Sequence, residues 1–379
     1  KYIINVDKDG KGLLQFSTKR LQGRKLFSWG RNTASDHCQE FLTEDAGRYV
    51  EIQAGLGKTQ YGCIPMAPHT AWEWMECYGP AYSEELSADV YEKSFEERNA
   101  YVTGYLQKHH LIEELEEELK ESKKMALTKA EMVTPGSGYG TFRKECQRTG
   151  HLEFVKRTKA MELWEHFFET GALHCPDPDD EPDSFWSGEE FLQNLKQTTL
   201  DPAAPNHKNW YAYYHIGILE FRKGNDKVSK EMYENSLKLR ENAWALHALA
   251  CLCLYEGNKN LAALYVQRGM ELKRHCLSYQ KEGLKILSQC EAYEAVLQQY
   301  AAMDEDIKSI GRVQYYHVLG LVRTGRLEEA DKLLNSEAGI LVDDVREGED
   351  NLQDLWEILN HELHQDREKL PYRYDFHAN

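Results

Sequence analysis

Two tryptophans and a carboxylate fall at alternate positions in residues 71–76, which read Ala-Trp-Glu-Trp-Met-Glu. Alternate side chains of a β-strand point to the same face, so Trp72, Trp74 and Glu76 are expected to lie together. Indole rings offer flat apolar platforms for the C–H faces of sugars, and a carboxylate accepts hydrogen bonds from sugar hydroxyls. The pattern favours a carbohydrate site.

A second alternating stretch could complete such a site. Residues 48–53 place Glu51 and Gln53 on one face of a strand. Glycoside hydrolysis needs two carboxyl groups across the scissile bond, separated by about 5 to 10 Å. If the protein is an enzyme, we therefore expect Glu51 and Glu76 to be the catalytic pair. The expected substrate contacts are Trp29, Gln53, Gln60, His69, Trp72 and Trp74.

Structural explanations compete with this chemistry. Tryptophans at a period of two are also ordinary core residues of a β-sandwich, with carboxylates at its edge, and His69 follows a proline, as a loop histidine that bonds backbone would. Adjacent His109 and His110 diverge on a helix, which is poor metal-ligand geometry. The sequence has no serine or cysteine nucleophile elbow. We expect no metal and no cofactor.

The composition bears on partners and compartment. The 379 residues carry a formal charge of −17, which argues against nucleic acid and against an anionic membrane surface. Nine cysteines contain no CxxC pair, which suits free thiols in a reducing cytosol. No apolar run is long enough to span a membrane, and no signal peptide is visible. We expect a cytoplasmic protein, and the strand-like start at Lys1 predicts a piece of a longer chain.

The character of the sequence changes along the chain. Residues 1–80 contain short alternating runs between glycine turns, which predict five or six strands of an incomplete β-sandwich. Residues 81–200 are expected to form a helical connecting region, with a long helical stretch to about residue 130 and an acidic, proline-rich linker at 175–182. Residues 341–379 are expected to form a C-terminal helix and tail.

Residues 201–340 contain repeats. Gly224, Gly257 and Cys290 are 33 residues apart, and Gly325 marks a fourth unit. Small residues five positions after and seven positions before each of the first three keep the same period: Ser229, Ala262 and Ala295, and Gly217, Ala250 and Gly283. Paired antiparallel helices pack closely where one presents a small residue to the other, and the step matches a tetratricopeptide repeat. The sequence therefore predicts an array with a concave groove, which binds a peptide or braces the rest of the chain.

Several spaced motifs resemble a known group of proteins: residues 24–30 (Arg-Lys-Leu-Phe-Ser-Trp-Gly), 49–56 (Tyr-Val-Glu-Ile-Gln-Ala-Gly-Leu), 65–74 and 136–140 (Gly-Ser-Gly-Tyr-Gly). They are similar to large bacterial proteins that join a galactose-mutarotase-like β-supersandwich, a domain of unknown function, to C-terminal tetratricopeptide repeats. The resemblance covers nearly the whole chain. It implies an α+β, mainly α fold, in which a galactose-mutarotase-like β-sandwich portion precedes the helical array. It also implies a carbohydrate-related role, and it assigns no acid, base or nucleophile.

Two functions are consistent with these features. The leading hypothesis is a carbohydrate-binding or carbohydrate-processing protein, a glycoside hydrolase if catalytic, acting on a mono- or oligosaccharide while the repeats brace the β domain. The alternative is a non-catalytic scaffold that binds a protein partner on the repeat groove. Residues 211–221 and 244–255 contain no lysine or arginine, which counts against a clamp for a peptide carboxylate.

Overall fold

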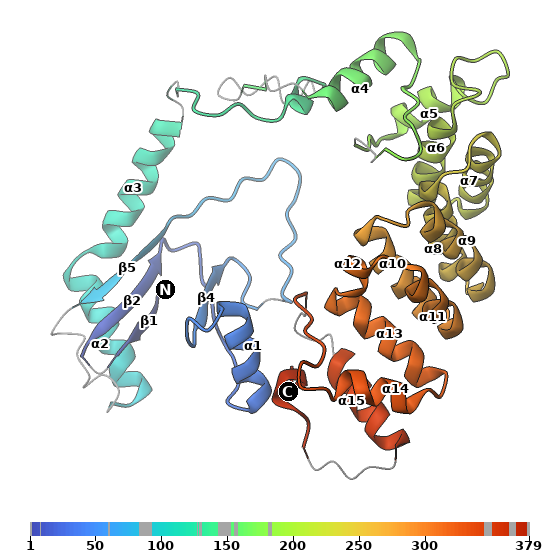
Figure 1. Ribbon diagram of the computed structural model, residues 1–379. Coiled ribbons are helices and arrows are strands. Elements are labelled where there is room, and N and C mark those ends of the chain that lie inside the picture. Colours follow the sequence, from blue (N-terminus) through green and yellow to red (C-terminus); the bar gives the residue numbers. More distant parts are fainter. Residues whose placement is uncertain are drawn as a thin grey trace. The chain divides into compact units, whose positions relative to one another are not determined.

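The computed structural model describes residues 2–7, 9–59, 61–82, 93–126, 128, 131–142, 153–154, 158–180, 184–344, 351–363 and 369–376. The chain divides into two compact units, residues 1–134 and residues 135–379, here called the N-terminal unit and the helical unit. The fold is mainly helical, with a small β region confined to the N-terminal unit (Figure 1). Each unit is described by itself.

A three-stranded antiparallel sheet is the largest β element of the N-terminal unit. Its order is β1 (Tyr2–Val6), β2 (Lys11–Ser17) and β5 (Glu76–Tyr82). Strand alternation sends Leu14 and Phe16 of β2 to one face and Gln15 and Ser17 to the other. Apolar side chains of α2 (Phe95–Lys108) and α3 (Leu111–Ala126) complete the core on the first face. The second face is left for polar residues.

The long helical stretch expected to about residue 130 is formed by two helices, α2 and α3. Ser94 begins α2 with a capping box that it shares with Glu97. The helix ends at Lys108 with His109 as its C-cap, and His110 takes a left-handed φ of 52° that an α-helix does not continue through. The two adjacent histidines therefore lie at a turn between two helices.

A two-stranded antiparallel sheet pairs β3 (Gly23–Ser28) with β4 (Val50–Gly55). Helix α1 (Thr33–Thr43) lies between these strands in sequence, so the expectation that residues 1–80 are all β is wrong at this point. The missed signal is an N-cap: the Asn32 side chain accepts a hydrogen bond from the backbone N–H of Ser35 at 2.8 Å. Five strands are described, but the galactose-mutarotase-like sandwich stays a prediction.

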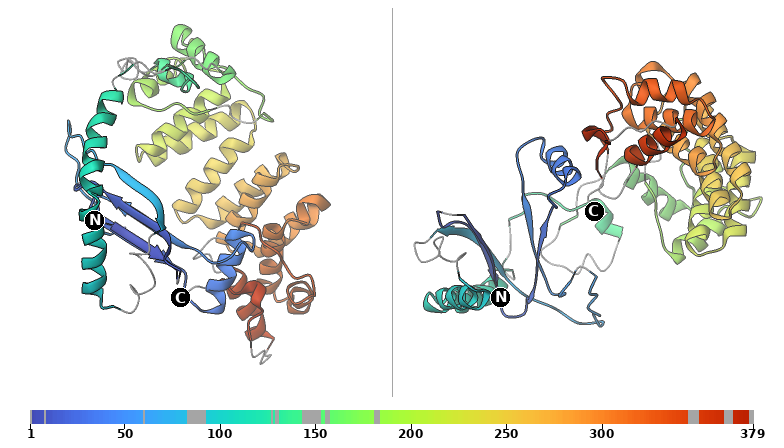
Figure 2. Two further views of the ribbon diagram at one scale, coloured as in Figure 1. Left: turned by 90° about the vertical axis from the view of Figure 1, so that its left-hand side faces the viewer. Right: turned by 90° about the horizontal axis from the view of Figure 1, so that it is seen from below.

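The helical unit contains four consecutive helical hairpins, stacked side by side in Figures 1 and 2. The hairpins are α6 (Trp210–Arg222) with α7 (Asp226–Leu239), α8 (Ala243–Tyr255) with α9 (Lys259–Leu272), α10 (Leu277–Gln289) with α11 (Tyr293–Ala302), and α13 (Gly311–Arg323) with α14 (Leu327–Leu334). Helices α4 (Lys159–Thr170) and α5 (Glu189–Gln197) precede them, and the short α12 (Glu305–Lys308) precedes α13. Helix α15 (Asn351–Glu362) follows.

The period of small residues has the physical basis that the sequence indicated. Gly224, Gly257 and Gly325 follow first helices with left-handed φ angles of 77°, 79° and 78°. A Cβ on Gly217 would lie 2.4 Å from the Tyr233 ring of the partner helix, so only glycine fits without displacement. The predicted repeats and their turns are thus confirmed.

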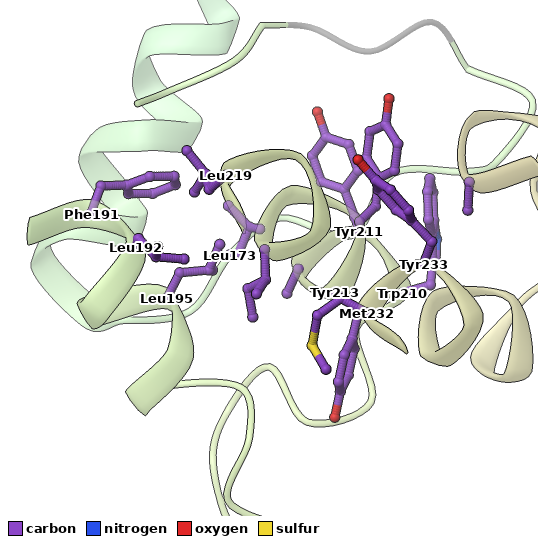
Figure 3. Close-up of a cluster of buried hydrophobic side chains, with 14 of the residues drawn as sticks. Leu173, Phe191, Leu192, Leu195, Trp210, Tyr211, Tyr213, Leu219, Met232 and Tyr233 are labelled. Carbon is purple, nitrogen blue, oxygen red and sulfur yellow. The ribbon is translucent and has the colours of Figure 1, made fainter. Parts of the chain in front are cut away.

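The connecting region contributes directly to the core of the first hairpin. Figure 3 shows α5 side chains, among them Phe191 and Leu195, in one cluster with side chains of α6 and α7. Trp164 and Phe167 of α4 belong to the same cluster, as does Leu173. Helices α4 and α5 therefore pack as part of the helical unit.

Candidate functional site

Glu76 lies at the centre of a polar cluster on the β5 face that turns away from α2 and α3. Its carboxylate accepts hydrogen bonds from Trp74 Nε1 at 3.1 Å, from the Tyr78 hydroxyl at 2.8 Å and from Gln15 Nε2 at 3.1 Å. Trp74 is 40 % exposed and Tyr78 is 54 % exposed. Two aromatic rings thus offer open surface beside one carboxylate.

Arg24 of β3 connects this cluster to the second sheet. Its guanidinium donates to Gln15 Oε1 at 3.0 Å, to the Leu21 carbonyl at 3.0 Å and to the Ser17 hydroxyl. Burial lowers the pKa of Arg24, and the nearby Glu76 carboxylate opposes that shift. Sequence reasoning missed Gln15 and Arg24, although a polar side chain in the apolar stretch of β2 was a visible signal.

The strand predicted over residues 71–76 is wrong, because β5 begins only at Glu76. The partner strand β2 ends at Ser17, opposite Glu76, and beyond that pair Met75 accepts from the Thr18 N–H at 3.0 Å and donates to the Thr18 hydroxyl at 3.0 Å. The structure therefore brings Trp74 and Glu76 together by a side-chain hydrogen bond. Trp72 instead lies under the Arg20 guanidinium, 5.6 Å from it.

The other predicted site residues are dispersed. Glu51 accepts a hydrogen bond from Gln53 Nε2 at 3.0 Å on β4, and Trp29 makes edge contacts with aromatic neighbours. His69 is exposed in a loop with a φ of 59°, and Gln60 lies outside the described residues. In the described part of the chain, no hydrogen bond joins the Glu51–Gln53 pair to the Glu76 cluster.

The helical unit carries a cleft of about 180 Å³ between α8 and α10. Its lining residues come from these two helices and from the residues before α10: Trp244, His247, Lys273, Cys276, Ser278, Tyr279 and Glu282. The Tyr279 hydroxyl donates to the Ala243 carbonyl at 2.9 Å, which fixes the ring. Lys273 Nζ lies 5.5 Å from the centre of the Trp244 ring. Burial lowers the pKa of His247, and the nearby Glu282 carboxylate opposes that shift.

The corresponding surface of the first hairpin is filled by the chain itself. Tyr211, Tyr214 and His215 of α6 are buried, and the Phe185 ring lies 5.4 Å from His215. Burial lowers the pKa of His215 to about 3. His215 Nε2 has no hydrogen-bond partner within the described ranges. The ring is held by aromatic neighbours, including the Trp164 ring at 5.5 Å.

Residues 173–180 run from the start of α6 to the ends of α7 and α9, and 177–180 form a turn in which the Asp180 N–H donates to the Asp177 carbonyl at 3.0 Å. Asn209, the N-cap of α6, donates its amide to the Leu173 carbonyl at 2.9 Å. Trp210 Nε1 donates to the Pro176 carbonyl at 3.2 Å. The Asn209 side chain also accepts from the first backbone N–H groups of α6, so it joins the stretch to the helix.

The same stretch reaches the ends of the first two hairpins. Arg240, the C-cap of α7, pairs with Asp177 at 3.3 Å. Lys273, the C-cap of α9, donates to the Asp179 carbonyl at 2.7 Å. Pro178 between them is buried. The acidic, proline-rich segment predicted as a linker is therefore bound along the helical unit over its described residues 175–180, while 181–183 lie outside the described residues.

Beyond this stretch, residues 184–186 pack against the core of the helical unit. Ser184 accepts hydrogen bonds from Trp164 Nε1 at 2.7 Å and from the Tyr139 hydroxyl at 2.9 Å. Trp186 packs edge-on against Phe142 and Phe168. The glycine-rich motif at 136–140 therefore serves to hold this return, through Tyr139.

Two general features of the described chain bear on function. None of its helices combines the length and the apolar character needed to cross a bilayer. Within the same ranges, no cluster of three or more His, Cys, Asp or Glu side chains is arranged to hold a metal ion.

Comparisons with known proteins agree with the helical architecture. The chain matches no protein-family model. It is 26 % identical over 145 residues to the Photosystem I assembly protein Ycf3 of Prochlorococcus marinus, covering 38 % of this chain and 70 % of that protein. A crystal structure of a TPR-domain containing protein from Parabacteroides distasonis ATCC 8503 covers 97 % of this chain, with a TM-score of 0.57 and 17 % identity. The chain spans 55 % of the length of that protein. The helical unit is thus a tetratricopeptide-type array.

Proposed function

We propose that this chain is a protein-interaction scaffold whose helical array binds an extended segment of a partner protein. The observation that supports this most strongly is the cleft between α8 and α10, which continues the surface already lined by residues 173–180. Lys273 belongs to both: it lines the cleft, and it donates to the Asp179 carbonyl. A chain that follows the same path would enter the cleft.

The chemistry of the cleft suits a peptide. Trp244 and Tyr279 provide aromatic surface for an apolar side chain. Lys273 is a donor for main-chain carbonyls, and Glu282 on the facing helix is an acceptor for main-chain N–H groups. The two rings, with Lys273 and Glu282 beside them, can bind an extended peptide that points one apolar side chain into the cleft.

The comparisons support this function more than a carbohydrate activity. One similar protein is named as an assembly protein, and the similar solved structure is described as a TPR-domain protein. Neither description mentions a carbohydrate. Tetratricopeptide-type arrays expose an extended concave surface, which is suited to binding other proteins.

Substitution of Trp244 tests the scaffold function. Partners recovered with the wild-type chain are identified, and their affinities are then measured directly with purified proteins. Trp244→Ala removes the aromatic wall of the cleft. It is expected to lower the affinity for at least one partner by tenfold or more, about 1.4 kcal/mol of binding free energy. Leu264→Ala removes an exposed side chain from α9 and is the matched control. Equal affinities of the two variants for every partner would contradict the proposal.

A carbohydrate function is a second candidate, supported by the exposed rings of Trp74 and Tyr78 beside Glu76. In this proposal, the N-terminal unit belongs to a galactose-mutarotase-like sandwich. Its sugar site includes the residues predicted from the sequence, with Glu51 and Glu76 as carboxylates in a glycoside hydrolysis.

Thermal-shift measurements against mono- and oligosaccharides test this second candidate. A sugar present at a hundredfold excess over its Kd stabilises the folded state by about 2.7 kcal/mol. Trp74→Ala is expected to abolish that shift. If no sugar raises the melting temperature of the wild-type chain, the carbohydrate function fails.

A further inference from the structure

We infer that the start of α6 and the ends of α7 and α9 form a binding surface for an acidic segment with alternating prolines, and that residues 174–180 occupy it when no such partner is bound. This surface, here called the edge, consists of Asn209, Trp210, Arg240 and Lys273. The inference rests on the proposed scaffold function, and it specifies the chemistry of the partner segment.

The captured carbonyls carry the argument. The edge takes the main-chain carbonyls of His174, Pro176 and Asp179. Residues 177–180 form a turn, because the Asp180 N–H donates to the Asp177 carbonyl at 3.0 Å. Pro178 occupies the second position of this turn, which its fixed φ favours. The edge therefore binds a proline turn and the residues before it, through backbone groups that any sequence supplies.

Selectivity comes from the side chains between those carbonyls. Pro178 is buried, whereas Asp177 points outward and pairs with Arg240. Arg240 and Lys273 place two cations along the edge of a chain whose formal charge is −17. Their positive charge complements a partner with acidic residues next to prolines. A basic segment would face two like charges.

The contacts of residues 174–180 are of a kind that a second segment can replace. The ends of the stretch are fixed, since Leu173 belongs to the core and Ser184 is hydrogen-bonded to Tyr139 and Trp164. Between these ends, the side-chain contact of Asp177 is an exposed ion pair, which contributes little. The advantage of the internal segment is its tether, which gives it a high effective concentration.

The experiment measures binding of a labelled, acetylated peptide with the sequence of residues 174–180, carrying serine in place of Cys175, by fluorescence anisotropy. The protein is the full chain, either wild type or an opened variant in which residues 176–180 are replaced by Gly-Ser-Gly-Ser-Gly. The opened variant is expected to bind the peptide at least about tenfold more tightly than wild type, because no internal segment competes. A peptide with glycine in place of both prolines is expected to bind more weakly.

Two substitutions in the opened variant test the assignment of the edge. Lys273→Met removes the donor for the Asp179 carbonyl but keeps a long side chain. It is expected to lower the affinity for the peptide. Lys238→Met removes an exposed lysine of α7 whose hydrogen bond among the described residues is to Asn235, one turn away, and it is the charge-matched control. If the opened variant does not fold, Asp177→Lys replaces it, because it repels Arg240 with a single substitution.

The outcomes distinguish a failure of this inference from a failure of the scaffold function. Equal peptide affinity for the wild-type chain and the folded opened variant would overturn the inference, as would equal losses from Lys273→Met and Lys238→Met. If the inference fails in this way while Trp244→Ala still weakens a partner, the scaffold function stands without it. If the peptide binds as expected but Trp244→Ala has the wild-type affinity for every partner, the edge is a peptide site and the cleft is not.

Discussion

Gly217 illustrates how one atom decides the packing of a hairpin. A Cβ at this position would meet the Tyr233 ring at 2.4 Å. Alanine favours a helix over glycine by about 1 kcal/mol, but overpacking costs about 1 to 3 kcal/mol. We expect Gly217→Ala to lower the free energy of unfolding by about 1 kcal/mol in urea titrations. Gly104→Ala in α2, where a Cβ meets nothing within 4 Å, is expected to raise it. A stabilising Gly217→Ala would contradict the packing.

His215 predicts a pH dependence of stability. Burial lowers its pKa to about 3 in the folded protein, while an unfolded chain takes up the proton near pH 6.5. The contribution of neutral His215 to the free energy of unfolding is therefore fully present above pH 6.5 and is lost as the pH falls toward 3. Between pH 7 and pH 5 the loss from this one group is about 2 kcal/mol.

His215→Phe keeps an aromatic ring among aromatic neighbours and removes the titration. We expect it to flatten the decline of the free energy of unfolding between pH 7 and pH 5, measured by chemical denaturation. Phe191→Leu, a change in the same core, is the control that lowers stability at every pH without changing the slope. An unchanged slope in His215→Phe would show that the buried ring does not cause the dependence.

The residues of the N-terminal polar cluster show where sequence reasoning succeeds and where it stops. Trp74 and Glu76 do lie together, but through a side-chain hydrogen bond next to the strand and not as two positions of the predicted strand. Gln15 and Arg24 were not predicted, because their approach depends on how β2 pairs with β5 and on where β3 follows. Strand pairing is a long-range property that local periodicity does not contain.

At the scale of elements, Asn209 couples a helix start to the stretch of residues 173–180. Its oxygen accepts from the first N–H groups of α6, while its amide donates to the Leu173 and His174 carbonyls. Asn209→Asp keeps the cap but places a carboxylate against those carbonyls, so we expect a loss of about 1 to 3 kcal/mol. Asn258→Asp at the exposed start of α9 keeps its cap without such carbonyls and is expected to be neutral.

Thermal and chemical denaturation of both variants measure this effect. Equal stability of Asn209→Asp and Asn258→Asp would contradict the account of the stretch as a bound element. The comparison uses the same chemical change at two helix starts, so general effects of the added charge cancel.

The elements were predictable to different degrees. The hairpin repeats followed from the period of small residues, because each repeat solves the same packing problem with its neighbours. Helix α1 was missed because its only strong local signal is the Asn32 cap. The segment at 175–182 was predicted as a linker because proline and aspartate are typical of loops. Nothing local reveals that the start of α6 and the ends of α7 and α9 present donors to it.

At the scale of the whole molecule, the two units have separate cores. The core of the N-terminal unit contains residues of the three-stranded sheet, α2 and α3, and the helical unit has its own clusters. A fragment of residues 135–379 is therefore expected to fold alone. Its helical circular dichroism signal should be lost in one cooperative thermal transition. The melting temperature should be close to that of one transition of the full chain. A fragment without cooperative melting would contradict the division into units.

The central claim is that the cleft between α8 and α10 binds another protein. Cys251 of α8 is exposed and contacts His247 of the cleft, whereas Leu264 is exposed on α9. A photo-cross-linking amino acid is placed at one or the other position of the full chain in cells that naturally make it. The account predicts a discrete protein adduct from position 251 and none from position 264. No adduct from 251, or the same adducts from both positions, would contradict it.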